Sequence, residues 1–270
     1  MSTSPLFLEE DPNRDRAVGL ILGALHGARA AAECDAASTD WPRADDVLLH
    51  LAESLVEHDE LHTPDLLRRL ITAWASRAGR GTLVGSVGAR RQPGPAADWV
   101  VGLAPICVAA LDDQRGAQFA AAQLAKAFNA SSAEGEALEV LSHFLGLAIL
   151  TRDRRQALAP WEWLGDTRVG QMASGRSLPI ATARDLVASV DQARCVTLCH
   201  VSFPTMLEAL RSVAAPAATF MMTGMLLGAL EGRLAFVGQP AIQVPTRLEV
   251  AIDRLLHWTR IRVRRWGARR

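Results

Sequence analysis

Apolar residues recur along this chain every three or four positions, the spacing that places them on one face of an α-helix. Over residues 45–58, for example, Val47, Leu48, Leu51 and Leu55 follow this spacing. The same kind of pattern predicts helices over 15–32, 63–76, 99–112, 114–128, 133–151, 181–193, 203–212, 217–231 and 246–265. No useful length of chain alternates apolar and polar residues as a half-buried strand does. The pattern therefore predicts an all-α protein.

Turn and loop residues separate these helices. Thr63, Pro64 and Asp65 are typical of an N-cap followed by proline at the first helical position. The stretch from Gly79 to Asp98 is rich in Gly, Pro and Arg and predicts a long loop, a kind of segment that is often functional or disordered. Pro160 to Pro179 predicts a second irregular segment.

The length and apolar content fit one domain with a large core. The chain has 270 residues, of which 49% are hydrophobic. We expect an N-terminal tail over 1–14 and a single helical domain over 15–270. The run from Ser212 to Leu230 carries no charge and is long enough to raise the question of a membrane span. It contains Pro216 and many Ala, Thr and Gly residues, so we interpret it as a buried central helix and expect no membrane partner.

Charge and the chain's start give two further expectations. The formal net charge is zero, which gives no reason to expect nucleic acid as a partner. Arginines crowd the C-terminus from Arg260 to Arg270, and a solvated helix end explains most of them. The start is acidic at Glu9, Glu10 and Asp11, unlike the basic beginning of a secretion signal. We therefore expect a cytoplasmic protein.

Cysteines and histidines are the first candidates for metal ligands. Cys195 and Cys199 stand four residues apart beside His200, but no second pair lies at zinc spacing. We interpret both cysteines as buried small side chains. The histidines on predicted helices are interpreted as core or surface residues rather than ligands; they are His26, His50 and His143.

Three segments together resemble the ADP-ribosylglycohydrolase family. The first pairs an Asp-Arg start with a run of small residues and reads Asp15-Arg16-Ala17-Val18-Gly19-Leu20-Ile21-Leu22-Gly23-Ala24-Leu25-His26-Gly27. The second keeps Trp41 and, at the family's distance from it, Ala52-Glu53-Ser54-Leu55. The third is Gly224-Met225-Leu226-Leu227-Gly228-Ala229-Leu230-Glu231-Gly232. A weaker match covers 101–106.

The resemblance implies a single-domain, orthogonal helical bundle of the ADP-ribosylglycohydrolase type. In that family two magnesium ions at the centre of the bundle orient the ribose of an ADP-ribosyl group for cleavage. The metal-binding motifs differ here. The family's Thr-Asp-Asp-Thr is replaced by Pro42, Arg43, Ala44 and Asp45. The family's Gly-Gly-Asp-Thr-Asp-Thr falls, without a gap, on Val213, Ala214, Ala215, Pro216, Ala217 and Ala218.

These replacements remove the oxygen atoms that magnesium needs. Magnesium prefers a near-octahedral set of oxygen ligands, and alanine and proline side chains supply none. A guanidinium about 4 Å from a unit positive charge costs about 4 kcal/mol at an effective dielectric near 20, so Arg43 also opposes a cation. We therefore expect no cofactor, no bound metal and no catalytic residue. The candidate ligand-binding residues of the altered cleft are Trp41, Arg43, Asp45, Asp46, Ala215, Ala217 and Ala218.

The leading hypothesis is a catalytically inactive homologue that binds ADP-ribose or an ADP-ribosylated protein. Arg43 would pair with pyrophosphate oxygens and Trp41 would pack nearby. A second hypothesis is a protein-binding module with an exposed apolar patch near the loop at 79–98.

The third hypothesis is an active hydrolase with relocated acids. Adjacent residues of a helix do not face each other, so Asp45 is better read as an N-cap or first-turn acid than as half of a catalytic pair. An active site would need convergence of Glu33, Asp35, Asp45, Asp46 and Asp191.

Overall fold

The chain is mainly helical in the part that the computed structural model describes, residues 12–34, 43–77, 97–176 and 186–267. Within these residues there is no strand, which confirms the all-α prediction. The helices, in chain order, are α1 (Pro12–Cys34), α2 (Ala44–His58), α3 (Thr63–Arg77), η2 (Ala97–Gly102), α4 (Leu103–Ala109), α5 (Gln114–Ala127), α6 (Ser132–Thr151), α7 (Arg154–Ala157), α8 (Thr167–Ala173), α9 (Leu186–Cys199), α10 (Phe203–Ser212), α11 (Ala217–Glu231), η3 (Gly232–Phe236) and α12 (Thr246–Gly267).

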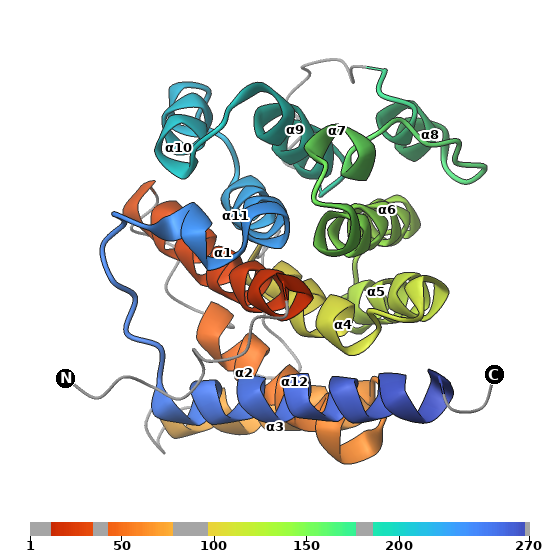
Figure 1. The fold of residues 1–270 in the computed structure, drawn as a ribbon, viewed down its shortest axis with the longest axis vertical. Helices are drawn as coiled ribbons and strands as arrows, with labels where there is room; N and C mark the ends of the chain where they lie inside the picture. The colour runs from red at the N-terminus through yellow and green to blue at the C-terminus, as the bar shows by residue number, and fades with distance from the viewer. Residues whose placement is uncertain (1–11, 35–42, 78–96, 177–185, 268–270) are drawn as a thin grey trace.

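Helices α1 and α11 lie side by side at the centre of the bundle (Figure 1). Figure 1 shows α7–α10 on one side of this pair and α2, α3 and α12 on the other. Every residue of α11 from Ala218 to Leu230 is buried, as predicted for a central helix. Among the described residues, no helix combines the length and the apolar run that crossing a bilayer requires.

Glycines allow the close approach of α1 to α11. Gly23 faces Gly224, Gly19 faces Gly228, and the two helices run antiparallel. A Cβ atom added at Gly23 would overlap the carbonyl oxygen of Gly224. The small residues in two of the family-like segments therefore set the distance between the two central helices.

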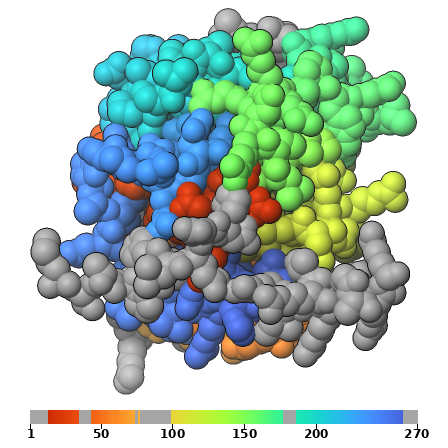
Figure 2. All heavy atoms as spheres, in the orientation of Figure 1, coloured from red at the N-terminus to blue at the C-terminus, as the bar shows by residue number. Residues whose placement is uncertain are grey.

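The start of α1 is fixed by neighbours far along the chain. Asp15 Oδ1 accepts a hydrogen bond from Arg233 Nε of η3 at 2.5 Å. Arg16 Nη1 donates to the carbonyl oxygen of Ala148 in α6 at 3.2 Å. In the space-filling view, this part of α1 (red) reaches the surface between blue and green residues (Figure 2). The helix begins at Pro12, so the last residues of the predicted 1–14 tail are already helical.

Several predicted boundaries were wrong. The helix predicted over 181–193 runs to Cys199 as α9, and the one predicted over 99–112 consists of the 3-10 helix η2 and α4, which ends at Ala109. The cap of α3 is His62 rather than Thr63, because the His62 ring Nδ1 accepts a hydrogen bond from the Asp65 backbone N–H at 3.3 Å. The segment predicted as irregular from 160 to 179 contains α8, which Asp166 caps by accepting from the N–H groups of Arg168 and Val169. A helix of seven residues is too short to leave a clear periodic signal.

Cys195 and Cys199 were predicted to be buried, and this is wrong: both are exposed. The buried face of α9 carries Val190, Ala193 and Thr197 instead. Residues four apart on a helix share a face, so both thiols point to solvent together.

Candidate functional site

The first half of the predicted cleft lies at the start of α2. Arg43 is the N-cap residue with an extended backbone, and its side chain is 67% exposed. Its Nε donates to Asp45 Oδ1 at 3.2 Å, so Asp45 is a first-turn acid paired with the cap residue. Ala44 and Asp46 are buried. The predicted companion of Arg43, Trp41, lies outside the described residues, as does residue 42.

The second half lies where the chain enters α11. Ala214 has a left-handed backbone with φ of 48°, and its neighbours turn the chain from α10 into α11. Ala215 and Ala217 are half-buried and Ala218 is buried. Their side chains offer methyl groups, so the only oxygen atoms that these three residues present are backbone carbonyls.

The two halves are not joined by polar contacts of Arg43 or Asp45. Within the described part of the chain, the only hydrogen bond of the Arg43 side chain is the one to Asp45. The structure thus brings Arg43 and Asp45 together, and it brings neither into a hydrogen bond with Ala215, Ala217 or Ala218.

Glu33, one of the acids considered as a relocated ligand, is paired with arginines. Its Oε1 accepts from Arg29 Nε at 3.4 Å and its Oε2 from Arg211 Nη2 at 3.0 Å. These pairs link the end of α1 to the end of α10, a few residues before Ala215. All three side chains are about half exposed, so each pair contributes well under about 1 kcal/mol. Both carboxylate oxygens nevertheless already have cationic partners.

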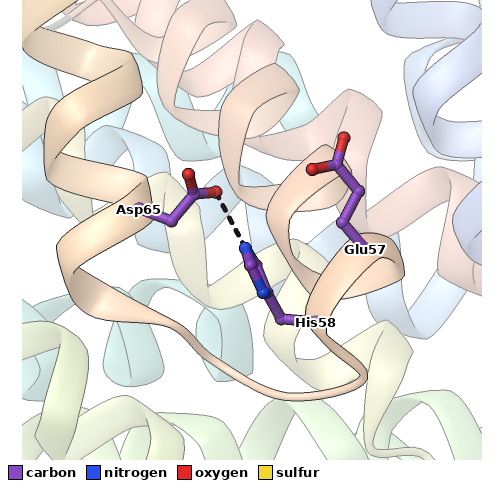
Figure 3. A group of neighbouring side chains, drawn as sticks. All are labelled: Glu57, His58 and Asp65. Atoms are coloured by element: carbon purple, nitrogen blue, oxygen red, sulfur yellow. Dashed lines mark ion pairs between the residues drawn. The ribbon is translucent and has the colours of Figure 1, made fainter.

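Three side chains that could hold a metal come together elsewhere, at the end of α2 and the start of α3. Figure 3 shows Glu57, His58 and Asp65, whose donor atoms all lie within 4.8 Å of one another. No other such group occurs among the described residues, so Glu33, Asp45, Asp46 and Asp191 do not form one, and Asp35 lies outside the described residues. His58 Nε2 lies 3.3 Å from Asp65 Oδ2.

Arginines already occupy the oxygens of this group. Arg69 Nε donates to Asp65 Oδ2 at 2.5 Å, and another nitrogen of Arg69 donates to Glu57. Arg68 donates to the other oxygen of Asp65. Burial alone would raise the pKa of Asp65, but the hydrogen bonds from Arg69 and Arg68 hold it well below its usual range. The carboxylates and guanidiniums therefore satisfy one another, and a divalent cation would be repelled at close range.

Glu53, from the family-like Ala-Glu-Ser-Leu segment, extends this network to α12. Its Oε1 and Oε2 accept from Arg247 Nε and Nη2 at 2.9 and 3.0 Å, a bidentate pair. Arg69 Nη1 donates to the same carboxylate at 3.3 Å. This role of Glu53 was not predicted from the sequence. No local signal could have found it, because Arg247 is 194 residues away.

Two histidines are packed against aromatic rings. The His26 ring stacks on Phe236 with centroids 4.5 Å apart, and burial, together with Arg29, lowers its pKa to about 4. His143 stacks on Trp161 at 4.0 Å. Both histidines are therefore half-buried residues packed on aromatic side chains. His50 is buried with its Nδ1 3.4 Å from Glu53 Oε2.

Comparison with known proteins identifies the fold of this chain. Neither the protein-family models nor the curated proteins contain a match to this chain. Among solved structures, the chain is similar to one described as an "ADP-ribosylglycohydrolase-related protein complex". The TM-score is 0.71 and the identity 19%, over 93% of this chain and 100% of the other. The chain therefore has the ADP-ribosylglycohydrolase fold that its three sequence segments predicted.

Proposed function

We propose that this protein is a non-catalytic member of the ADP-ribosylglycohydrolase family that acts by binding. One observation carries the proposal. Where the family motif supplies carboxylate and hydroxyl oxygens, the chain has Ala44 at the start of α2 and Ala215, Ala217 and Ala218 at the start of α11. Methyl groups cannot coordinate magnesium, so the bundle would keep the family's framework without its metal ligands.

The pairing of Glu33 supports the same proposal. A carboxylate that helps to bind magnesium has to be free to turn toward the ion, whereas both oxygens of Glu33 accept from arginines. The hypothesis of an active hydrolase with relocated acids would need at least three converging carboxylates. Glu33, Asp45, Asp46 and Asp191 do not come together in that way among the described residues.

ADP-ribose is the ligand that the start of α2 suits best. Arg43 is exposed, and its contact with Asp45 uses only Nε, so within the described residues its two terminal nitrogens have no partner. A guanidinium matches the geometry of phosphate oxygens, and the N-terminus of a helix also favours negative charge. A pyrophosphate at Arg43 would use both features.

Calorimetry with ADP-ribose, with and without magnesium, tests the proposal. We expect binding that does not depend on magnesium and that weakens at least tenfold in Arg43→Ala. The matched control is Arg254→Ala, which removes an exposed arginine of α12 and should bind as the wild type does. Absence of binding at millimolar ADP-ribose would exclude ADP-ribose as the ligand. Magnesium-dependent release of ADP-ribose from a modified arginine or serine would overturn the non-catalytic proposal itself.

A protein partner is the second candidate. It rests on the related solved structure, which is described as a protein complex. An exposed apolar patch near the loop at 79–98 would favour such a partner, but residues 79–96 of that loop lie outside the described residues. The described residues do carry an exposed apolar loop elsewhere, between α7 and α8.

A further inference from the structure

The loop between α7 and α8 is held firmly against α6. Trp163 Nε1 donates to Glu136 Oε2 at 2.9 Å, and the backbone N–H of Asp166 donates to the same oxygen at 2.6 Å. Gly165 lies between them, and a Cβ atom there would overlap Glu136 Oε2. The loop conformation therefore depends on this glycine and on one carboxylate of α6.

The other end of the loop is fixed by aromatic stacking. The Trp161 ring lies on His143 of α6 with centroids 4.0 Å apart, and Gln114 of α5 lies 2.7 Å from the Nδ1 of His143. Trp161 also meets Trp163 edge to face at 5.3 Å. Both indoles are half-buried and fixed in place.

This fixed loop exposes apolar surface. Leu164 follows Trp163 and is 93% exposed. A single exposed leucine is ordinary on a protein surface, but here it stands beside two half-buried tryptophans on a loop with little freedom to move. A shallow hollow of about 410 Å³ adjoins Trp163 and Leu164 and continues to Gln171 and Arg176 of the neighbouring segment.

Between Glu136 and His143, the two α6 residues that contact the indoles, lies Glu139, whose carboxylate has no counter-ion among the described residues. Glu139 is half-buried, three residues after Glu136 and four before His143, so these residues share one face of the helix. Among the described residues, the Glu139 carboxylate has no hydrogen bond and no ion pair. Burial and the neighbouring Glu136 raise the pKa of Glu139. Glu136 itself accepts only from neutral donors, an indole and a backbone N–H.

We propose that Glu139, Trp161, Trp163 and Leu164 form a docking surface for a partner protein that inserts an arginine or lysine beside an apolar pocket. The inserted cation would neutralise Glu139 and lie against the indole faces, which attract cations. Leu164 would enter the partner's apolar pocket. Beside α6 a phosphate group is disfavoured, because the carboxylates of Glu136 and Glu139 have no cationic partner among the described residues and would repel it. The surface is distinct from Arg43: Figure 1 places α8 and α2 on opposite sides of the molecule.

A pair of short peptides tests the surface on the full chain. The probe is acetyl-Leu-Arg-Leu-amide, and its matched control has citrulline, an uncharged analogue of similar shape, in place of arginine. The indole N–H signals of Trp161 and Trp163 are followed by NMR and assigned with Trp161→Phe and Trp163→Phe. We expect saturable shifts with the arginine peptide in roughly the millimolar range, and at least tenfold weaker binding of the citrulline peptide.

Two variants separate the proposed contact from general adhesion. Glu139→Gln should keep the fold, because it removes a charge without a described counter-ion. It should weaken the binding of the arginine peptide at least tenfold. Glu208→Gln, at an exposed position of α10, should bind as the wild type does. Equal shifts from both peptides, unchanged binding by Glu139→Gln, or no shift at 10 mM peptide would overturn the proposal.

Analytical ultracentrifugation of the unliganded protein tests whether a second copy of the chain, rather than a different protein, binds this surface. A monomer at about 100 µM agrees with the proposal. A dimer that Leu164→Asp dissociates would make a second copy of the chain the occupant and would overturn the assignment to a different protein. None of these outcomes bears on the ADP-ribose titration, since Arg43 is not part of this surface.

Discussion

His26 illustrates how burial sets the charge of single residues in this bundle. Its ring is enclosed by Phe236 and Phe203, and Arg29 stands one turn further along α1. Both the desolvation and the arginine disfavour the imidazolium. The sequence placed His26 on a helix and suggested that it is not a ligand, but the aromatic neighbours come from residues about 200 positions away and leave no local pattern.

The lowered pKa of His26 predicts a loss of stability in mild acid. Because the folded pKa is about 4 and the ordinary value is 6.5, the stabilisation is fully present above pH 6.5 and is lost as the pH falls toward 4. We expect the contribution of His26 to the free energy of unfolding to fall by about 1–2 kcal/mol between pH 7.5 and pH 5. Denaturant titrations at the two pH values measure this difference.

Two variants make the assignment to His26 specific. His26→Phe should flatten the pH dependence by that amount, since the ring remains but cannot take up a proton. His257→Gln, at an exposed position of α12, should leave the dependence as in the wild type. An unchanged pH dependence in His26→Phe would place the acid sensitivity elsewhere.

At the scale of helices, the periodic pattern was a good guide to most of the longer helices, although α1 begins three residues before its predicted start and α9 runs to Cys199, six residues past its predicted end. α2, α5, α6, α10, α11 and α12 lie within two residues of the predicted ranges. The short α7 and α8 were missed, because four and seven residues hold too few apolar positions to show a period. The predicted N-cap of α3 was one residue too late, because the ring of His62, rather than the hydroxyl of Thr63, accepts the capping hydrogen bond.

The contact between α1 and α11 predicts a strong effect of a single methyl group. Gly23→Ala would place a Cβ atom against the backbone of Gly224, which cannot rotate away as a side chain can. We expect the free energy of unfolding to fall by about 1–3 kcal/mol, the usual range for overpacking, although alanine is the better helix former. Thermal and denaturant unfolding followed by circular dichroism measure the change.

A matched substitution controls for helix propensity. At Gly135 in α6 an added Cβ atom meets only the Cβ of Ala125, at the ordinary contact distance of 3.7 Å. Gly135→Ala should therefore be neutral or stabilise by up to about 1 kcal/mol. Equal effects at the two glycines would mean that α1 and α11 are not as close as described.

At the scale of the whole molecule, the sequence segments predicted the fold because their small residues are the ones that pack the two central helices together. The contacts of the residues around the predicted cleft could be predicted less well. Alanines at the start of α11 are plain in the sequence, but the pairing of Glu33 with Arg211 joins residues 178 positions apart. The same holds for Glu53 and Arg247. Such ion pairs depend on the assembled bundle, and no local spacing encodes them.

Cysteine reactivity offers a measure of global opening. Cys107 lies in the core with its Sγ near the Ser142 carbonyl, and burial raises the pKa of its thiol to about 12. The thiolate is the reactive form, so Cys107 should react with an aromatic disulfide reagent only when the bundle unfolds. The exposed Cys34, Cys195 and Cys199 should react at once.

A triple variant isolates the buried thiol. With Cys34→Ser, Cys195→Ser and Cys199→Ser combined, the remaining labelling rate should rise with denaturant in step with global unfolding. Rapid labelling of this variant in native buffer would show that the region around α4 opens on its own.

The glycine contact between α1 and α11 also has a consequence for synthesis on the ribosome. Helix α1 leaves the exit tunnel long before the helix that covers its glycine face, because α11 can emerge only after residue 217 has been added. Until then the glycine face of α1 lacks its native cover, and such exposed apolar surface makes a nascent chain prone to aggregate. Completion of the bundle's centre therefore waits until α11 has left the exit tunnel.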